Sequence, residues 1–252
     1  MFSRNRFLIG FVCLLFLFAA LSTAGLATSP EKDKAEDQAK RAREAAEVMN
    51  EIMGIREEGI PEELMARAHA IAVIPDVTKG AFGIGGRWGK GLVTHRGANG
   101  KWSAPSYIEL AGGSFGLQIG VERADVVLVF VNEEGFRSML DGKVKLGADA
   151  SIAAGPVGRR AEVGTDIKFE SAILSYSRSK GLFAGVALDG SSLTIDDSGN
   201  KKAYGAKYSA EDILLNNRVR INNVVAPFVQ AVEKWAPARR ISERYEKGVG
   251  LI

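Results

Sequence analysis

The chain has 252 residues, with 33 Lys and Arg against 30 Asp and Glu, two histidines and one cysteine. A charge balance this close to neutral excludes the strongly basic class of nucleic-acid-binding proteins, so no nucleic acid is expected as a partner. One cysteine excludes a disulfide within the chain, and two histidines in unrelated sequence contexts argue against a metal site.

Residues 1–27 have the pattern of a secretory signal peptide. Two arginines precede an apolar run over residues 7–21, and the small residues Gly25 and Ala27 suit cleavage near Ala27. Loss of this segment would remove the cysteine and two of the 33 basic residues, leaving 31 against 30 acids. We therefore expect a periplasmic or otherwise exported protein at the cell envelope. An uncleaved anchor is the alternative, although about 15 apolar residues fall short of the ~20 that span a bilayer.

Residues 28–60 are predicted to form an N-terminal helical segment. Residues 31–53 contain no Gly or Pro and are rich in helix formers. Their apolar positions follow the spacing 4-3-4-3-4 along one stripe, namely Ala35, Ala39, Ala42, Ala46, Met49 and Met53. This stripe predicts a helix that docks on its own domain or pairs with a second helix. The alternative is an amphipathic helix that lies on a membrane surface.

From residue 71 onward the pattern changes to the alternation of β-strands. The predicted strands are 70–74, 80–88, 91–95, 102–110, 114–122, 126–131, 144–152, 172–178 and 182–189. The predicted helices of this part are 61–68, 133–140, 210–216 and 222–235. Residues 126–131 are apolar on both faces, which predicts a central strand. Helices on either side of a long antiparallel run indicate an α+β fold with a strongly curved, barrel-like sheet.

The last predicted strand, 182–189, has apolar residues at Leu182, Ala184, Val186 and Leu188, which predicts that this side of the strand is buried. Gly185 in its middle predicts that another backbone approaches closely.

Three segments of the sequence partly match patterns of catalytic or phosphate-binding sites. Residues 112–116 match G-x-S-x-G around Ser114, but the following residues alternate as a strand and both histidines precede the serine, unlike in an α/β-hydrolase. Residues 80–91 are glycine-rich but lack the spacing of a phosphate loop, and a glycine-rich hairpin is favoured. Residues 196–199 read as a loop rather than as paired catalytic carboxylates. We expect no enzymatic activity, no catalytic residue, no metal and no cofactor.

Basic residues recur at the predicted turns and strand ends. No single pair is distinctive, because Lys and Arg are ordinary surface residues. Several of them at one end of the sheet would form a site for the anionic headgroups of lipids. The candidate lipid-binding residues are Arg87, Lys90, Arg96, Lys101, Arg159, Arg178 and Lys180.

Several glycine-containing motifs follow one another along the chain. They include Gly89-Lys90-Gly91-Leu92-Val93, Gly100-Lys101-Trp102-Ser103-Ala104-Pro105, Phe115-Gly116-Leu117-Gln118-Ile119-Gly120, Ala154-Gly155-Pro156-Val157-Gly158-Arg159 and Tyr176-Ser177-Arg178-Ser179-Lys180-Gly181. In this order they resemble the SYLF-domain family, which includes yeast actin regulators and many exported bacterial proteins. The resemblance covers about residues 61–235. It divides the chain into a lipid-binding domain at 61–236 and a C-terminal tail at 237–252.

The resemblance implies non-enzymatic binding of anionic phospholipid membranes through basic surface residues, aided by the N-terminal amphipathic helix. The alternative interpretation is a structural or scaffold protein of the envelope that self-associates through the helix at residues 31–53.

Overall fold

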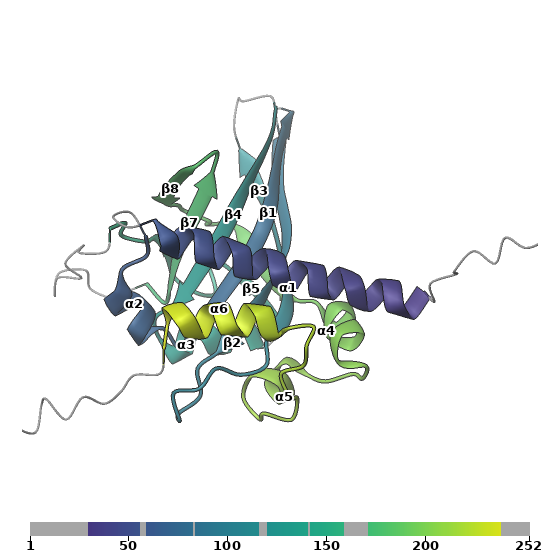
Figure 1. Cartoon of the computed structure of the whole chain (residues 1–252). Helices are drawn as coiled ribbons and strands as arrows, with labels where there is room; N and C mark the ends of the chain where they lie inside the picture. Colours follow the sequence, from purple (N-terminus) through teal and green to yellow (C-terminus); the bar gives the residue numbers. More distant parts are fainter. Residues whose placement is uncertain are drawn as a thin grey trace, which may run out of the picture.

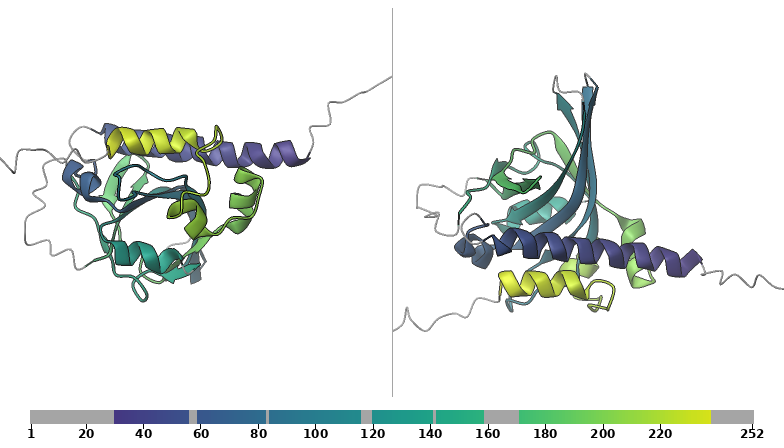
Figure 2. Two further views of the ribbon diagram at one scale, coloured as in Figure 1. Left: turned by 90° about the horizontal axis from the view of Figure 1, so that it is seen from below. Right: turned by 45° about the horizontal axis from the view of Figure 1, so that its top comes forward.

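The computed structural model describes residues 30–55, 59–82, 84–115, 120–140, 142–158 and 171–237. These residues form one nine-stranded sheet with the order β5-β9-β3-β2-β1-β4-β7-β6, and β8 pairs with β7. The strands are β1 (Ala70–Phe82), β2 (Ile84–His95), β3 (Ser106–Phe115), β4 (Gly120–Phe130), β5 (Lys143–Lys145), β6 (Ile152–Ala154), β7 (Ile173–Ser179), β8 (Leu182–Gly185) and β9 (Ser191–Ile195). Among the strands of the described residues, β6 and β7 are the only pair that runs parallel. The sheet curls strongly and has helices before and after it (Figures 1 and 2), which confirms the predicted α+β class.

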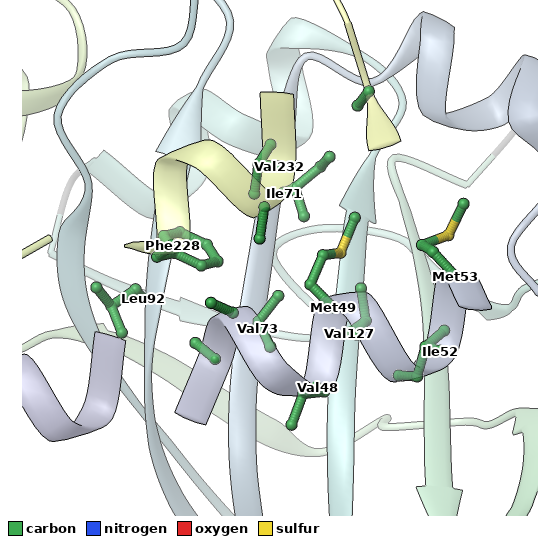
Figure 3. Packing of buried hydrophobic residues seen from close by; sticks show 14 of the residues in the cluster. Val48, Met49, Ile52, Met53, Ile71, Val73, Leu92, Val127, Phe228 and Val232 are labelled. Carbon is green, nitrogen blue, oxygen red and sulfur yellow. The ribbon is translucent and has the colours of Figure 1, made fainter. Parts of the chain in front are cut away.

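One face of the sheet is covered by two helices that lie side by side, α1 (Pro30–Gly54) and α6 (Ala226–Trp235) (Figures 1 and 2). Met49 of α1 and Phe228 of α6 are fully buried against Val73 and its neighbours on the strands (Figure 3). We call this side of the sheet the α1 face. The predicted helix 31–53 is therefore confirmed, and its stripe docks on its own domain and on a second helix.

The other side of the sheet packs against α3 (Glu133–Leu140) and α5 (Ala210–Leu214), and we call it the α3 face. Phe136 and Ile213 lie there, in one cluster with Leu128 of β4. Successive residues of a strand point to opposite faces, so β4 contributes to the clusters on both sides. The predicted central strand at 126–131 is thereby confirmed.

The remaining helices are α2 (Glu62–Arg67) and α4 (Asp197–Tyr204). The predicted helices at 61–68, 133–140, 210–216 and 222–235 correspond to α2, α3, α5 and α6. The interpretation of residues 196–199 as a loop was wrong. The carboxylate of Asp196 accepts a hydrogen bond from the backbone N–H of Gly199 and caps the N-terminus of α4, so the polar run begins a helix.

The first two predicted strands have different limits in the structure. Strand β1 continues from Ala70 to Phe82 through a register irregularity at residues 75–77, where Asp76 has a φ of 50°. A bulge of this kind admits Pro75, which has no N–H to offer the ladder. The chain then reverses before Ile84, so the predicted strand 80–88 was wrong and the predicted glycine-rich hairpin at 80–91 is confirmed.

Other strand limits also differ. The predicted strand 102–110 begins only at Ser106, 114–122 falls on two strands with residues 116–119 outside the described residues, and 144–152 is two short strands joined by turns. Strand β9 was not predicted. The last predicted strand, 182–189, ends at Gly185 as β8, and its buried side was wrong there: Leu182 is 77% exposed, whereas Phe183 is buried and stacks on Tyr176 with the ring centroids 5.5 Å apart. Leu188, beyond the strand, is buried as predicted.

Gly185 does meet another backbone. A Cβ atom there would overlap the carbonyl oxygen of Gly155, as its place in mid-strand predicted.

Candidate functional site

The ends of β1 to β4 extend beyond α1 (Figure 1) and expose two large apolar side chains. Trp88 of β2 is 53% exposed and Val121 of β4 is 77% exposed. Trp88 pairs with Thr78 and Val121 pairs with Gly80, two positions further along β1, so both side chains lie on one face. That face is the α1 face, because Val127, six positions after Val121 on β4, packs in the cluster under α1.

The backbone around these side chains is smooth. Gly80, Gly86 and Gly113 pair in one row across β1, β2 and β3, and Val121 ends the row on β4. A Cβ atom at Gly80 or Gly113 would meet nothing within 4 Å among the described residues. Packing within the described chain therefore gives no reason for these two glycines, and the surface beside Trp88 stays open for an outside contact.

The turn between β7 and β8 reaches the same end of the sheet. Lys180 and Gly181 both have positive φ angles, 49° and 81°, which is the geometry of a two-residue hairpin turn. The hydroxyl of Ser179 lies 3.0 Å from the carbonyl oxygen of Arg123, which places the turn beside the start of β4. Leu182 follows the turn and is as exposed as Val121, but it pairs with Ser179, so its side chain lies on the α3 face.

These neighbours form a surface that is both apolar and cationic. Arg123 lies on the α1 face, because it pairs with Thr78 as Trp88 does, and both Arg123 and Lys180 are exposed. We call this surface the sheet tip; its members are Trp88, Val121 and Arg123 on the α1 face, with Lys180 in the neighbouring turn.

Of the residues predicted from sequence, Lys180 lies in the sheet tip and Arg178 lies close to it. Arg178 is engaged in ion pairs with Asp125 of β4 and Glu51 of α1. Arg87 lies at the same end but on the α3 face, because it pairs with Lys79 one position after Thr78. The structure thus brings three of the seven candidates to one end of the sheet.

Two other candidates, Lys90 and Lys101, lie away from the sheet tip. Lys90 pairs with Glu109 and lies 3.6 Å from Asp196, which also contacts Arg41 of α1. Lys101 is exposed in the connection between β2 and β3, at the opposite end of the sheet from the β1–β2 hairpin. Arg159 lies outside the described residues.

Arg96 lies between helix ends. Its guanidinium donates hydrogen bonds to the carbonyl oxygens of Ala66, Met65 and Ala236 at 2.6, 3.1 and 2.9 Å, and it stacks 4.5 Å above the ring of Trp102. These contacts join the ends of α2 and α6.

Sequence analysis missed the apolar members of the sheet tip and Arg123. A tryptophan and a valine in alternating strands suggest burial, and only the glycines opposite them indicate an open face. The exposure of Trp88 follows from the length of the strands beyond α1, which residue patterns do not show.

A second cluster joins the two histidines that were expected in unrelated contexts. His69 Nδ1 and His95 Nε2 lie 3.4 and 3.5 Å from the same Glu133 oxygen, beside a cavity of about 860 Å³. Burial lowers the pKa of His95, and the neighbouring carboxylate of Glu133 opposes this shift. Among the described residues no group of three His, Cys, Asp or Glu side chains could hold a metal ion.

None of the helices in the described part of the chain is both long and apolar enough to cross a bilayer. The apolar stripe of α1 is not available to a membrane in this structure, because it is buried from Ala42 to Met53 against the sheet and α6.

The fold and the sheet tip define a class of protein: a single curled sheet covered by helices, with an exposed surface at the end of its long strands. Residues 111–235 match the family model Ysc84, described as Las17-binding protein actin regulator. The chain belongs to this family, also called the SYLF family, which confirms the resemblance.

Relatives from fungi and animals align over most of the chain. It is 37% identical to Protein YSC84 of Saccharomyces cerevisiae over 190 residues, which are 74% of this chain and 40% of the relative. It is 35% identical to LAS seventeen-binding protein 3 of Saccharomyces cerevisiae over 190 residues, 74% of this chain and 41% of the relative. It is also 35% identical to SH3 domain-containing YSC84-like protein 1 of Homo sapiens over 211 residues, 81% of this chain and 59% of the relative.

The chain thus spans about half the length of these relatives. Their names and the family description mention a regulator and binding proteins, and none mentions an enzymatic activity.

Proposed function

We propose that this domain binds anionic phospholipid membranes at the cell envelope without catalysing a reaction, and that the sheet tip is the surface that meets the bilayer. The observation that carries the proposal is the exposure of Trp88 and Val121 on the face that also carries Arg123, with Lys180 exposed at the same end of the sheet. Large apolar side chains exposed together mark interaction surfaces. Tryptophan favours the interface between headgroups and acyl chains, and each Lys or Arg near an anionic membrane contributes about 1 kcal/mol.

Helix α1 is less suited to this role than its amphipathic pattern suggests. Met49, Ile52 and Met53 are almost completely buried against the sheet and α6 (Figure 3). Exposing one such side chain costs roughly 1.5–3 kcal/mol. Insertion of α1 into a membrane would therefore have to compensate the free-energy cost of removing several of these side chains from the protein core. The same cost applies to self-association of an envelope scaffold through this stripe. The sheet tip needs no such rearrangement.

Sedimentation with lipid vesicles tests the proposal. We expect the protein to pellet with vesicles that contain phosphatidylglycerol and not with pure phosphatidylcholine vesicles. The double variant R123E/K180E should weaken binding by about 30-fold or more, because two contributions of about 1 kcal/mol are lost and repulsion is added. Trp88→Ala should weaken binding to the same vesicles without removing its dependence on lipid charge.

Lys101→Glu is the matched control. It reverses one charge, half of the change made in the double variant, at the opposite end of the sheet and should leave binding intact. Equal pelleting with neutral and anionic vesicles, or an equal loss in K101E, would show that the sheet tip is not the membrane-binding surface.

A further inference from the structure

A cavity of about 240 Å³ lies on the α3 face, behind the sheet tip. Its polar lining includes Lys79, Arg87, Glu122, Ser177 and Ser179. Its apolar lining comes from Val77 of β1, from alanine and valine of β4, and from residues 186–188 after β8. The volume is below the roughly 300–1,000 Å³ of pockets for drug-sized ligands. A headgroup with a few carbon atoms would fit this cavity, whereas a whole lipid would not.

Two cations are placed side by side in this cavity. Lys79 of β1 and Arg87 of β2 are direct partners in the strand register and lie on the same face. Like charges at such positions repel one another. Glu122, the partner of Lys79 on β4, is the one carboxylate among the described residues that line the cavity, and it also lies 3.2 Å from the hydroxyl of Ser179.

Arg87 has an unfulfilled hydrogen-bonding capacity. Its Nε atom is buried and has no hydrogen-bond partner among the described residues. Burial lowers the pKa of this guanidinium, and the negative charge of Asp189 opposes the shift only in part. A buried donor without an acceptor costs free energy, and a bound anion would remove this cost.

We propose that this cavity binds one phosphate group, with Arg87 and Lys79 as its ligands. Guanidinium pairs with phosphate through two parallel hydrogen bonds, and an ammonium group adds a point charge. The phosphate comes either from a lipid headgroup or from a free phosphate compound. With a lipid as its source, the inference rests on the proposed membrane binding and names the part of the lipid that enters the domain: the headgroup phosphate passes behind the sheet tip while the acyl chains stay in the bilayer.

Titration of the protein with inorganic phosphate and with glycerol phosphate, followed by changes in amide NMR shifts, tests the cavity directly. Wild-type shifts should move at residues around the cavity, and Arg87→Gln should weaken this response by about tenfold or more. Arg123→Gln removes the same charge from the other face of the same sheet end and should leave the response unchanged. Lys79→Gln provides a second cavity variant if Arg87→Gln does not fold, as judged by circular dichroism.

Vesicle binding of the same variants separates the two sources of phosphate. If a lipid headgroup is the ligand, Arg87→Gln weakens pelleting with phosphatidylglycerol vesicles as well. If a free phosphate compound is the ligand, pelleting is unchanged while the titration response is lost. A titration response that is equal in wild type and in both cavity variants overturns the inference. If wild-type protein responds to phosphate in the titration but does not pellet with phosphatidylglycerol vesicles, only the proposed membrane binding is refuted.

Discussion

Arg178 of β7 donates hydrogen bonds to one carboxylate oxygen of Asp125 on β4 from both Nε and Nη2, at 3.1 and 2.7 Å. The same Nη2 contacts Glu51 of α1, and the second oxygen of Asp125 accepts a hydrogen bond from the backbone N–H of Asp76 at 3.1 Å. Arg178 therefore joins two strands and the helix that covers them. It is half-buried in this arrangement, which makes it a structural residue at the base of the sheet tip.

Replacement of Arg178 by Ala should lower the free energy of unfolding by about 1–3 kcal/mol, because Asp125 would lose a charged, partly buried partner. Lys180→Ala, two residues away in the exposed turn, should stay within about 0.5 kcal/mol of wild type. Urea denaturation of both variants measures the difference, and equal stabilities would contradict the structural role. Since Arg178→Glu should also destabilise the fold, Lys180 and Arg123 are the better positions for tests of membrane binding.

Two glycines on neighbouring strands should respond in opposite ways to replacement by Ala. A Cβ atom at Gly91 would overlap the carbonyl oxygen of Val73 and lie 2.8 Å from the Cα atom of Ile74. Gly91→Ala should therefore destabilise the protein by about 1–3 kcal/mol or more, because the central strands must separate. Gly113→Ala has open space and should be neutral or stabilise the fold by up to about 1 kcal/mol through a less flexible unfolded chain.

Chemical denaturation distinguishes these cases. A loss of stability in Gly113→Ala as large as in Gly91→Ala would mean that the glycine row on the α1 face serves packing and not an outside contact. Vesicle binding of Gly113→Ala then reports on the role of the smooth surface beside Trp88.

Local composition was enough to predict α1 and the buried strand β4. A run of 23 residues, 31–53, without Gly or Pro can hardly be anything but a helix, and six apolar residues in a row suit a strand covered on both sides. The limits of β1 and β2 were harder to predict. Pro75 looks like the end of a strand, and the residue pattern of 80–91 continues through the chain reversal without a distinct turn signal. Helix α4 was missed because Asp196 begins a helix with the same residue types that begin a loop.

The candidate site depended on pairing between distant segments, which residue patterns do not encode. Arg87 and Lys180 come to one end of the sheet only because β1 lies between β2 and β4, and β4 lies beside β7. The two histidines meet Glu133 for the same reason: Ala70 pairs with both His95 and Phe130, so the starts of β1 and α3 converge on the end of β2. Trp88 is exposed because α1 does not cover the end of the sheet where it lies, and this depends on how the helix packs on the strands.

His95 should make the fold less stable in mild acid. Its ring is buried and stacks on Phe136 with the centroids 4.3 Å apart, and burial lowers its pKa below the usual 6.5 even though Glu133 lies 3.5 Å away and favours the charged form. The unfolded chain therefore binds the proton more readily than the folded one, so this contribution to stability is complete above pH 6.5 and decreases as the pH falls through 6.5 toward the lower folded pKa. Few other side chains titrate between pH 5 and 8, because the chain has only two histidines.

Urea midpoints measured from pH 8 to pH 5 should decrease for wild type and for His69→Gln, and His95→Gln should flatten the curve. An NMR titration in which the His95 imidazole shows a pKa at or above 6.5 would contradict this prediction even if His95→Gln proved too unstable to study.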